Sequence, residues 1–596
     1  MKKEFAMKRV LLLFAFVCVC YSNVYAFDED DFASGVFVLN EDWYGHQNST
    51  INMWYPDNED DPYNQVFYRV FQAVNGLELG CTAQYGQVFG DRIYIMAKQH
   101  KDPGASVAGG RLTVVDARTM RCLAQLPVIN PDGSASDDGN TQTGVISGAA
   151  LGDGRACCGV TPEKVYLGTS NGIYILDTST LTVVGRIPGT ENELMTGDEN
   201  NIDGQGPLYQ NQIGSMIRTQ DYVFAIKQDE GVLVIDPETD RIVHVIKGCY
   251  STMVQAADGS LWAGMNLADP NEVNEYGVPL DHYPYGNNGS AWDGSGLLRI
   301  DPYTLETETR KLYIGGVPQS WYAWTAGKLT ASAKRNVLYF TYADPSAGQA
   351  VWFSDCMLYR YDIDRDYTNL IYNSSIDGDL WFYSSSLRVS PVDDQLYCHF
   401  YYGSNIANKN WIYRRYTDDG SSITPNAEWK LISNYWYPAM FIFPDNAAPE
   451  VSGMPASVTV GDSPVTIELA DKVVDADTPQ VSIVKRVADN TNPSSVDARI
   501  EHGNLVLTSL SPGESMVTVR FDSNGKTVDH VIGVNATVSG INDVVPDDIE
   551  GDVRVFTLTG TEVRHFRGMR CDAVAGLPSG MYIVSVNGKR TKVFVR

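Results

Sequence analysis

The residues best suited to chemistry in this sequence are histidines in segments rich in Gly, Asn and Asp. His46, His100 and His282 lie in such segments, and imidazole nitrogens bind metals or transfer protons near neutral pH. His399, by contrast, lies within an apolar run and is expected to pack in a core. The three loop histidines leave two alternatives, a shared metal or ligand site and three unrelated polar residues.

Aromatic residues gather in the same segments and at the starts of several apolar runs. Flat aromatic faces beside Asn and Gln offer contact area for glycans or large planar ligands at low entropic cost. The predicted ligand-binding residues are Trp43, Tyr44, His46, Asn48, His100, Tyr276, His282, Tyr283, Tyr285, Trp292, Trp321, Trp324, Trp352, Trp381 and Trp436. For the tryptophans that open apolar runs (Trp321, Trp324, Trp381 and Trp436), packing within the fold is an equal alternative.

The sequence has no nucleophile-elbow G-x-S-x-G, no H-E-x-x-H and no phosphate-binding P-loop. We therefore predict no catalytic residue, no resident metal and no cofactor, and a non-enzymatic binding protein is the leading hypothesis. A lyase or hydrolase that pairs a loop histidine with Asp281 is the alternative, and a protein–protein scaffold is a third possibility. Asp475-Ala-Asp477 fits either a calcium site or an ordinary polar turn.

An internal repeat predicts the scaffold that carries these segments. Apolar runs rich in Val, Ile and Tyr end in Asp, and the Asp residues of the clear copies are spaced by 61, 59, 65 and 61 residues. These aspartates are Asp116, Asp177, Asp236, Asp301 and Asp362. Each run reads as a strand whose Asp accepts backbone N–H groups in the following turn. A repeat of this length accommodates a four-stranded antiparallel blade, and stacked blades form a β-propeller.

Seven blades fit between Phe27 and Asp445. Complete blades are predicted near residues 66–128, 141–190, 209–247, 249–313, 316–372 and 375–433. The strand Tyr437–Phe443 is expected to complete the first blade beside Gly35–Asn40, which removes an open sheet edge. Long insertions fall between the second and third strands at residues 41–49, 99–110, 265–296, 343–355 and 402–410. They should emerge on one face, where ligands are expected.

The V-V-I-D-x-x-T pattern of the repeat resembles the YVTN-type β-propeller family, and residues 27–445 resemble its Bacteroidetes surface branch. That branch includes propellers that capture cobalamin for an outer-membrane transporter. The resemblance implies a cell-surface binding role, with cobalamin as a bound ligand and an outer-membrane transporter as a partner. No residue of this sequence is matched to a cobalamin contact.

Two smaller β domains are predicted after the propeller, which makes the whole chain all-β. Residues 446–540 alternate apolar and polar residues and lack Tyr and Trp, as is typical of an immunoglobulin- or cadherin-like sandwich. A linker at 541–550 precedes residues 551–596. This segment resembles the C-terminal sorting domain of Bacteroidetes type IX secretion, which implies contact with secretion machinery. The matching residues are Val553, Leu558, Gly560, Leu577, Pro578, Gly580, Tyr582, Asn587, Gly588, Lys592 and Val593.

The N-terminal segment predicts export. Lysines and an arginine precede the apolar run Val10–Cys20, and Val24-Tyr25-Ala26 fits a cleavage site, so residues 1–26 are predicted to be a signal peptide. The mature chain is expected on the cell surface, at the outer membrane or outside the cell, without a transmembrane span. Partial disulfide pairing, with some cysteines left as buried free thiols, is expected for such a chain. A net charge of −28 argues against nucleic-acid binding, because no basic surface is available for phosphates.

Overall fold

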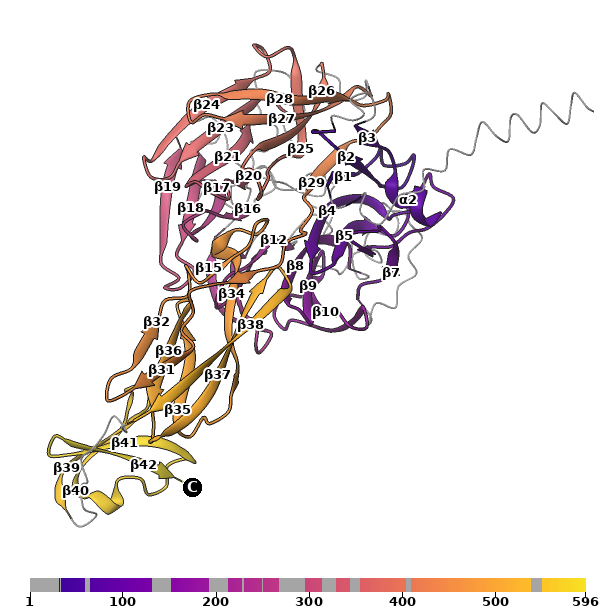
Figure 1. The fold of residues 1–596 in the computed structure, drawn as a ribbon. Helices are drawn as coiled ribbons and strands as arrows, with labels where there is room; N and C mark the ends of the chain where they lie inside the picture. The colour runs from indigo at the N-terminus through magenta and orange to yellow at the C-terminus, as the bar shows by residue number, and fades with distance from the viewer. Residues whose placement is uncertain are drawn as a thin grey trace, which may run out of the picture. The chain divides into compact units, whose positions relative to one another are not determined.

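A computed structural model describes residue 32 and residues 34–58, 65–130, 152–191, 213–227, 230–248, 250–266, 295–312, 329–342, 354–403, 409–537 and 549–595 (Figure 1). The chain divides into two compact units. The first contains Met1–Ala448, Asp475–Ile483 and Asp522–Lys526, and the second contains Pro449–Val474, Val484–Phe521 and Thr527–Arg596. Among the described residues no helix has the length and apolar character needed to cross a membrane.

The first unit is a β-propeller built from consecutive antiparallel sheets. From the innermost strand outward, the first sheets are β29-β1-β2-β3 (Pro438–Ile442, Val36–Asn40, Thr50–Trp54, Val66–Phe67), β4 to β7 (Cys81–Phe89, Arg92–Gln99, Leu112–Asp116, Cys122–Leu126) and β8 to β11 (Gly154–Thr161, Lys164–Thr169, Gly172–Asp177, Thr182–Arg186). The next are β12 to β15 (Ile213–Arg218, Val223–Lys227, Gly231–Asp236, Arg241–Lys247) and β16 to β19 (Tyr250–Gln255, Leu261–Asn266, Ser295–Ile300, Thr307–Leu312). The last are β20-β21-β23-β24 (Leu329–Ala331, Val337–Tyr342, Met357–Asp362, Tyr367–Asn373) and β22-β25-β26-β27-β28 (Ser354–Asp355, Leu380–Val389, Leu396–Tyr402, Trp411–Asp418, Ile423–Lys430).

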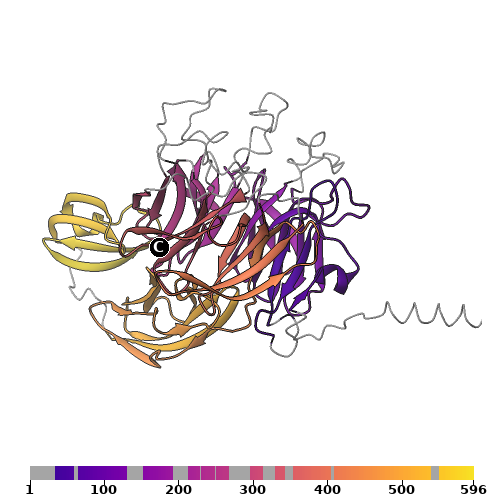
Figure 2. The same ribbon diagram turned by 90° about the horizontal axis from the view of Figure 1, so that it is seen from above.

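The sheets follow one another around a closed ring. Strands β4, β8, β12, β16, β20, β25 and β29 contact one another in this order, and β29 contacts β4 again. Figure 1 looks onto this ring and Figure 2 views it from a direction at right angles. The ring closes because β29 pairs with β1, with Phe37 opposite Ile442 and Leu39 opposite Met440. The predicted pairing of the late strand with the first one is confirmed.

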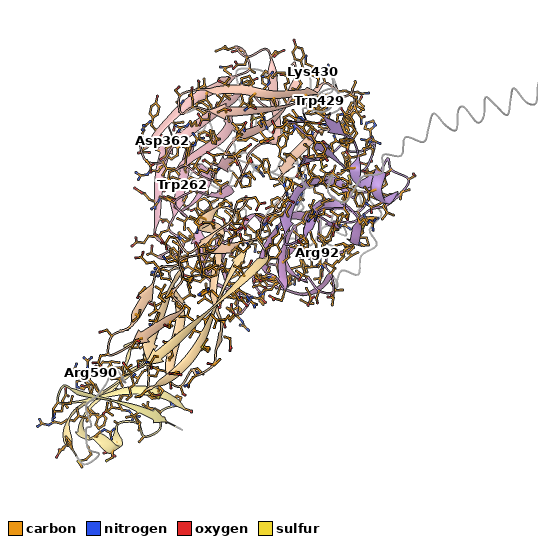
Figure 3. All side chains as sticks on the ribbon, viewed as in Figure 1. Arg92, Trp262, Asp362, Trp429, Lys430 and Arg590 are labelled. Atoms are coloured by element: carbon orange, nitrogen blue, oxygen red, sulfur yellow. The ribbon has the colours of Figure 1, made fainter. Side chains whose placement is uncertain are left out.

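Apolar packing between sheets explains the sequence pattern of the strands. The run Gly231–Ile235 is buried on both faces, whereas the outer strand β15 is largely exposed. Trp262 of β17, labelled in Figure 3, packs against Tyr361 of β23 in the next sheet, and their ring centroids are 5.7 Å apart. A short helix, α2 (Val70–Asn75), connects the first two sheets and buries Val70 and Phe71.

The repeated aspartates act in the turns as the sequence predicts. Asp116 Oδ1 accepts hydrogen bonds from the N–H groups of Arg118 and Thr119 at 3.1 and 2.8 Å. Asp301 Oδ1 accepts the N–H groups of Tyr303 and Thr304, both at 2.9 Å. These bonds use backbone donors that a tight turn would otherwise leave unpaired. The turns lie between the third and fourth strands, so they belong to the face opposite the long insertions.

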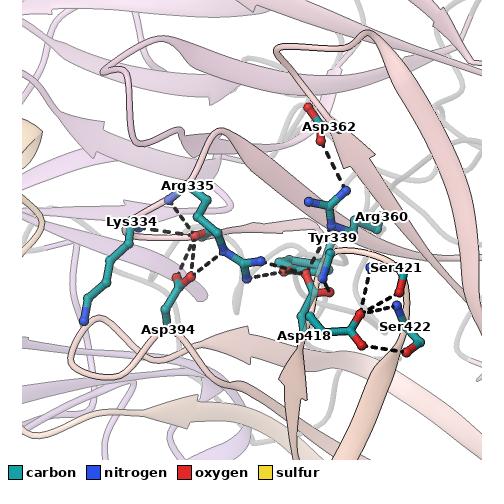
Figure 4. A network of polar contacts seen from close by, with 12 residues as sticks. Lys334, Arg335, Tyr339, Arg360, Asp362, Asp394, Asp418, Ser421 and Ser422 are labelled. Carbon is teal, nitrogen blue, oxygen red and sulfur yellow. Dashed lines mark hydrogen bonds and ion pairs between the residues drawn. The ribbon is translucent and has the colours of Figure 1, made fainter.

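A buried ion-pair network joins the last two sheets on this turn face (Figure 4). The side chain of Asp418 is 1% exposed and accepts hydrogen bonds from Arg335 and Arg360, both at 3.1 Å, and from Tyr339 at 2.5 Å. Arg335 also binds Asp394 at 2.9 Å. Three donors therefore compensate the desolvation of one carboxylate.

In the second unit, β31-β38-β37-β34 (Ser457–Val460, Lys526–Ala536, Gly513–Ser523, Val484–Asn490) and β32-β36-β35 (Val465–Ile467, Asn504–Ser509, Val496–Glu501) form two sheets. β30 pairs with β33 (Glu450–Val451, Val473–Val474), and a 3-10 turn lies at Arg570–Asp572. Another 3-10 turn, Gln480–Ser482, belongs to the first unit. The last sheet is β40-β39-β41-β42 (Glu562–Met569, Glu550–Thr557, Gly580–Val586, Lys589–Val595). The sandwich and sorting-domain assignments stay predictions.

One expectation from the sequence is wrong for the described residues. No disulfide joins Cys81, Cys122, Cys157, Cys158, Cys356, Cys398 and Cys571, so the predicted partial disulfide pairing is not found among these described cysteines. Most lie inside strands and are buried by apolar neighbours, where cysteine behaves as a small hydrophobic residue. Asp475-Ala-Asp477 has the contacts of a polar turn, since Asp477 Oδ2 accepts the N–H groups of Asn446 and Ala447.

We expect Asp418→Asn to lower the free energy of unfolding by about 3 kcal/mol, because Arg335 and Arg360 lose a buried partner. Urea denaturation at neutral pH measures this effect. Asp364→Asn is the matched control, because the carboxylate of Asp364 is exposed and accepts a hydrogen bond from the side chain of Asn336. Equal losses in the two variants would contradict the role given to Asp418.

The Asp418 contribution should also depend on pH. Burial alone would raise the pKa of Asp418, but hydrogen bonds from Tyr339 and Gly420 and the charges of Arg335 and Arg360 lower it below the ordinary value of 3.8. The stabilisation is therefore present above that value and is lost as the pH falls through the lower, folded-state pKa. The difference in stability between wild type and Asp418→Asn should shrink in acid, as denaturation curves at several pH values would show.

Candidate functional site

Two insertions of the propeller pack together on the face opposite the Asp turns. Asp102 Oδ2 accepts the N–H of Gly45 at 2.8 Å, which ties residues 99–110 to residues 41–49. Asn48 fastens the same two loops, since its Oδ1 accepts the N–H of Asp102 at 2.7 Å and its Nδ2 donates to the Val107 carbonyl at 2.8 Å. The side chain of Asn48 is buried, and through these hydrogen bonds it holds the two loops together. We call this side of the propeller the looped face.

A partly exposed aromatic group lies on the looped face. The ring centroid of Trp43 is 4.7 Å from that of His46 and 4.3 Å from that of Tyr435, in the connection that leads into β29. Lys409 Nζ lies 3.9 Å from the centre of the Tyr435 ring. The sequence predicted Trp43 and His46, which belong to one insertion, and the structure adds Tyr435 and Lys409 from segments far away in the sequence. Together they offer aromatic faces, an imidazole and an ammonium group to a ligand.

The other predicted residues have different positions. Tyr44 is exposed beside the aromatic group, and His100 is partly buried at the start of its loop. Trp381 and Trp436 are buried, and their indole N–H groups donate to Asp379 Oδ1 and the Ile432 carbonyl, both at 2.9 Å. These contacts fit the packing alternative for the two tryptophans. The predicted residues outside the described part of the chain are Tyr276, His282, Tyr283, Tyr285, Trp292, Trp321, Trp324 and Trp352.

A buried polar group that the sequence reasoning missed lies at the looped-face ends of several strands. Glu41 directly follows β1, and its Oε2 accepts the hydroxyl of Tyr383 from β25 at 3.0 Å. Its Oε1 accepts Gln84 Nε2 from β4 at 2.5 Å. Lys98, near the end of β5, interacts electrostatically with Glu41. We call Glu41, Gln84, Lys98 and Tyr383 the mouth cluster, because it is assembled from innermost strands and the ends of the strands beside them.

Burial shifts both charged members of the mouth cluster toward neutrality. Desolvation raises the pKa of Glu41 to about 7, although Lys98, Gln84 and Tyr383 favour the charged carboxylate. Desolvation, followed by the charge of Arg155, lowers the pKa of Lys98 to about 7, although Glu41 favours the charged amine. An acid and a base that titrate in the same range are typical of sites that bind ions or transfer protons.

The backbone at the mouth cluster is held in a sparsely populated conformation. Asp42 has a φ of 58° and Tyr437 a φ of 43°, both in the left-handed region. The Glu41 N–H donates to the Tyr437 carbonyl at 2.9 Å, and the Asp42 N–H donates to the Trp436 carbonyl at 3.1 Å. Such backbone persists only when surrounding contacts hold it, and it is found disproportionately at functional sites.

Two signals in the sequence point to this cluster. Lys98 is a charged residue within the apolar strand Arg92–Gln99, and Glu41 directly follows the apolar strand Val36–Asn40. A charge in a strand that is otherwise buried calls for a compensating partner. The partner itself could not be found from sequence, because Glu41 and Tyr383 are 342 residues apart.

The described residues contain no group of three or more His, Cys, Asp or Glu side chains arranged to hold a metal. His46 and His100 belong to no such group, and His282 lies outside the described residues, so a shared site of the three histidines stays one of the two alternatives. His46 instead stacks on Tyr435 with a centroid distance of 5.8 Å.

Comparison with known proteins places the propeller region in one family. A family model described as "Domain of unknown function (DUF5074)" matches residues 34–444. No curated protein matches the chain.

Solved structures show distant likenesses. A quinonprotein alcohol dehydrogenase-like protein from Bacteroides thetaiotaomicron is 14% identical with a TM-score of 0.41, over 70% of this chain and 79% of that one. The extracellular domain of a putative one component system from the same organism is 12% identical with a TM-score of 0.34, over 85% of this chain and 57% of that one. A protein from Lactobacillus plantarum is 11% identical with a TM-score of 0.37, over 67% and 96% of the two chains.

We expect Glu41→Gln to stabilise the protein progressively as the pH rises from about 4.5 to about 7. The pKa of Glu41 lies above its ordinary value of 4.5, so the wild-type folded state keeps a proton that the unfolded state releases, and its stability falls across this window. Glutamine has no such proton, so the free energy of unfolding of Glu41→Gln should exceed that of the wild type by on the order of 2 kcal/mol near pH 7. Urea denaturation at several pH values measures it. Glu238→Gln, at an exposed turn, is the control and should show no such trend.

Proposed function

The chain belongs to the family described as "Domain of unknown function (DUF5074)", and we propose that it is an exported binding protein that holds a ligand on the looped face of a seven-bladed propeller. The observation that carries this proposal is the convergence of Trp43, His46 and Tyr435 above the ring, next to the mouth cluster. The opposite face is formed by tight Asp turns and the Asp418 network.

The composition of the looped face supports a ligand with flat or ring-shaped parts. Trp43 and Tyr435 meet edge to face at 65°, and both are only partly buried. Partly exposed aromatic rings that are fixed by their neighbours bind with little loss of side-chain entropy. Glycans and corrinoids such as cobalamin are the ligand classes that we propose to test first. An outer-membrane transporter is the partner that the corrinoid hypothesis implies.

The remaining parts of the chain fit delivery to the cell surface. In this proposal residues 1–26 direct export, the sandwich at 446–540 acts as a spacer, and residues 551–596 engage the type IX secretion machinery. The last sheet has its own apolar core of Val553, Val555, Tyr582, Val584 and Val586, as a separate sorting domain requires.

An enzyme is the second candidate function, and the mouth cluster is the observation that favours it. Glu41 and Lys98 both have pKa values near 7, so one can accept a proton while the other donates one. A lyase or hydrolase would then use these two residues as acid and base. Loss of turnover on a bound glycan in both Glu41→Gln and Lys98→Met would support this function.

We expect isothermal titration of residues 27–596 to detect binding of cobalamin or of members of a glycan panel. Trp43→Ala should weaken that binding by about tenfold, because it removes a large aromatic contact beside Tyr435. Tyr367→Ala is the control, since Tyr367 is 60% exposed in the outer strand β24, directly after an Asp turn. Flat isotherms for every compound would exclude both ligand classes, and equal effects of the two variants would exclude the looped face.

A further inference from the structure

The amine of Lys98 is buried without a hydrogen-bond partner among the described residues. Lys98 is 7% exposed. Its Nζ has no acceptor within hydrogen-bonding distance in the described part of the chain. A buried ammonium group without acceptors costs several kcal/mol, whereas one bound to an anion does not. The cost indicates that Lys98 is kept for an acceptor that the described part of the chain does not supply.

The carboxylates near Lys98 are already engaged by other groups. Glu41 accepts Tyr383 and Gln84, and Asp153 Oδ1 accepts the guanidinium of Arg111 at 3.0 Å with both side chains at most 1% exposed. Neither carboxylate forms a hydrogen bond with Lys98 Nζ, although both act on it electrostatically.

A second cation lies close to Lys98. The charge of Arg155, from the first residues of β8, disfavours the charged form of Lys98, which places two positive groups near one another at the mouth. Two like charges in a desolvated region repel each other unless an anion lies between or beside them. An oxyanion would therefore relieve this repulsion and also provide the acceptor that Lys98 lacks.

We propose that Lys98 is the anchor of a carboxylate-binding site at the mouth cluster, so that the ligand of the looped face carries a carboxylate group, as acidic sugars do. This inference rests on the proposed binding function and names its ligand class. The carboxylate accepts hydrogen bonds from Lys98 Nζ, and the ring of the sugar extends toward Trp43. A singly charged carboxylate fits this place better than a phosphate dianion, because Glu41 and Asp153 lie nearby.

The test compares acidic and neutral sugars on the mature chain, residues 27–596, by isothermal titration at pH 7. The probes are glucuronate and galacturonate and their oligosaccharides, with glucose and galactose oligosaccharides of equal length as neutral partners. We expect the acidic compounds to bind at least about tenfold more tightly than the neutral ones, since a charge-assisted hydrogen bond is added. Sodium sulfate is titrated in parallel, and binding as tight as that of the uronates would overturn the assignment to a carboxylate.

Two substitutions should separate the charge of Lys98 from its volume. Lys98→Met removes the ammonium while it keeps the apolar volume, and it should weaken uronate binding by about tenfold or more. Lys98→Arg keeps a positively charged donor and should hold uronate affinity within a few-fold of the wild-type value. Loss in the first variant and retention in the second cannot arise from a general loss of folding. Lys430→Met, in the exposed outer strand β28 (Figure 3), is the charge-matched control and should leave affinity unchanged.

The outcomes separate this inference from the proposed function. If neutral glycans or cobalamin bind, and the uronates bind no more tightly to the wild-type chain than to Lys98→Met, the carboxylate site is wrong and the binding function stands. If Lys98→Met changes thermal stability but leaves uronate affinity at the wild-type value, Lys98 serves only as the counter-charge of Glu41 and the inference is overturned. If no compound binds the wild-type chain, both proposals fail.

Discussion

The pairing of β29 with β1 is the interaction on which the architecture of the first unit depends. It joins residues separated by about the whole length of the propeller, with Phe37 opposite Ile442 and Leu39 opposite Met440. Without this pairing, one sheet would have an unpaired edge and its neighbours would lose a packing surface. Closure also fixes the connection Trp436–Tyr437 against Glu41 and Asp42, through two backbone hydrogen bonds. The looped face and the mouth cluster therefore exist only in the closed ring.

The two faces of the propeller use charge in different ways. On the turn face, Asp418 is buried but receives three donors, and its pKa is lowered. At the mouth, Glu41 and Lys98 are also buried, yet their pKa values move toward 7, because desolvation outweighs the interactions that favour their charged forms. The first arrangement stabilises the fold, whereas the second has a stability cost. Costs of this kind are typical of functional sites, where stability is given up for a group that a ligand can use.

Aromatic residues show the same division. Trp262 and Trp381 are strand residues buried between sheets, where their area stabilises the ring. Trp43 is only partly buried, although it contacts His46 and Tyr435. The difference comes from the position in the blade. A side chain in a strand packs against a neighbouring sheet, whereas a side chain in the insertion after the second strand lies on the looped face.

The local pattern of the sequence determined the strands, the Asp turns and the repeat, because each depends on residues a few positions apart. The run Gly231–Asp236 and the turn bonds of Asp116 follow from β-propensity and from the short reach of an Asp side chain. The repeat length and the late strand at 438–442 also made the closure of the ring predictable. Only the tertiary structure decided which polar groups meet at the mouth, since Glu41, Gln84 and Tyr383 come from three sheets and are unrelated in sequence. It also decided that Trp381 and Trp436 are buried while Trp43 is not, because burial depends on neighbours that closure of the ring brings together.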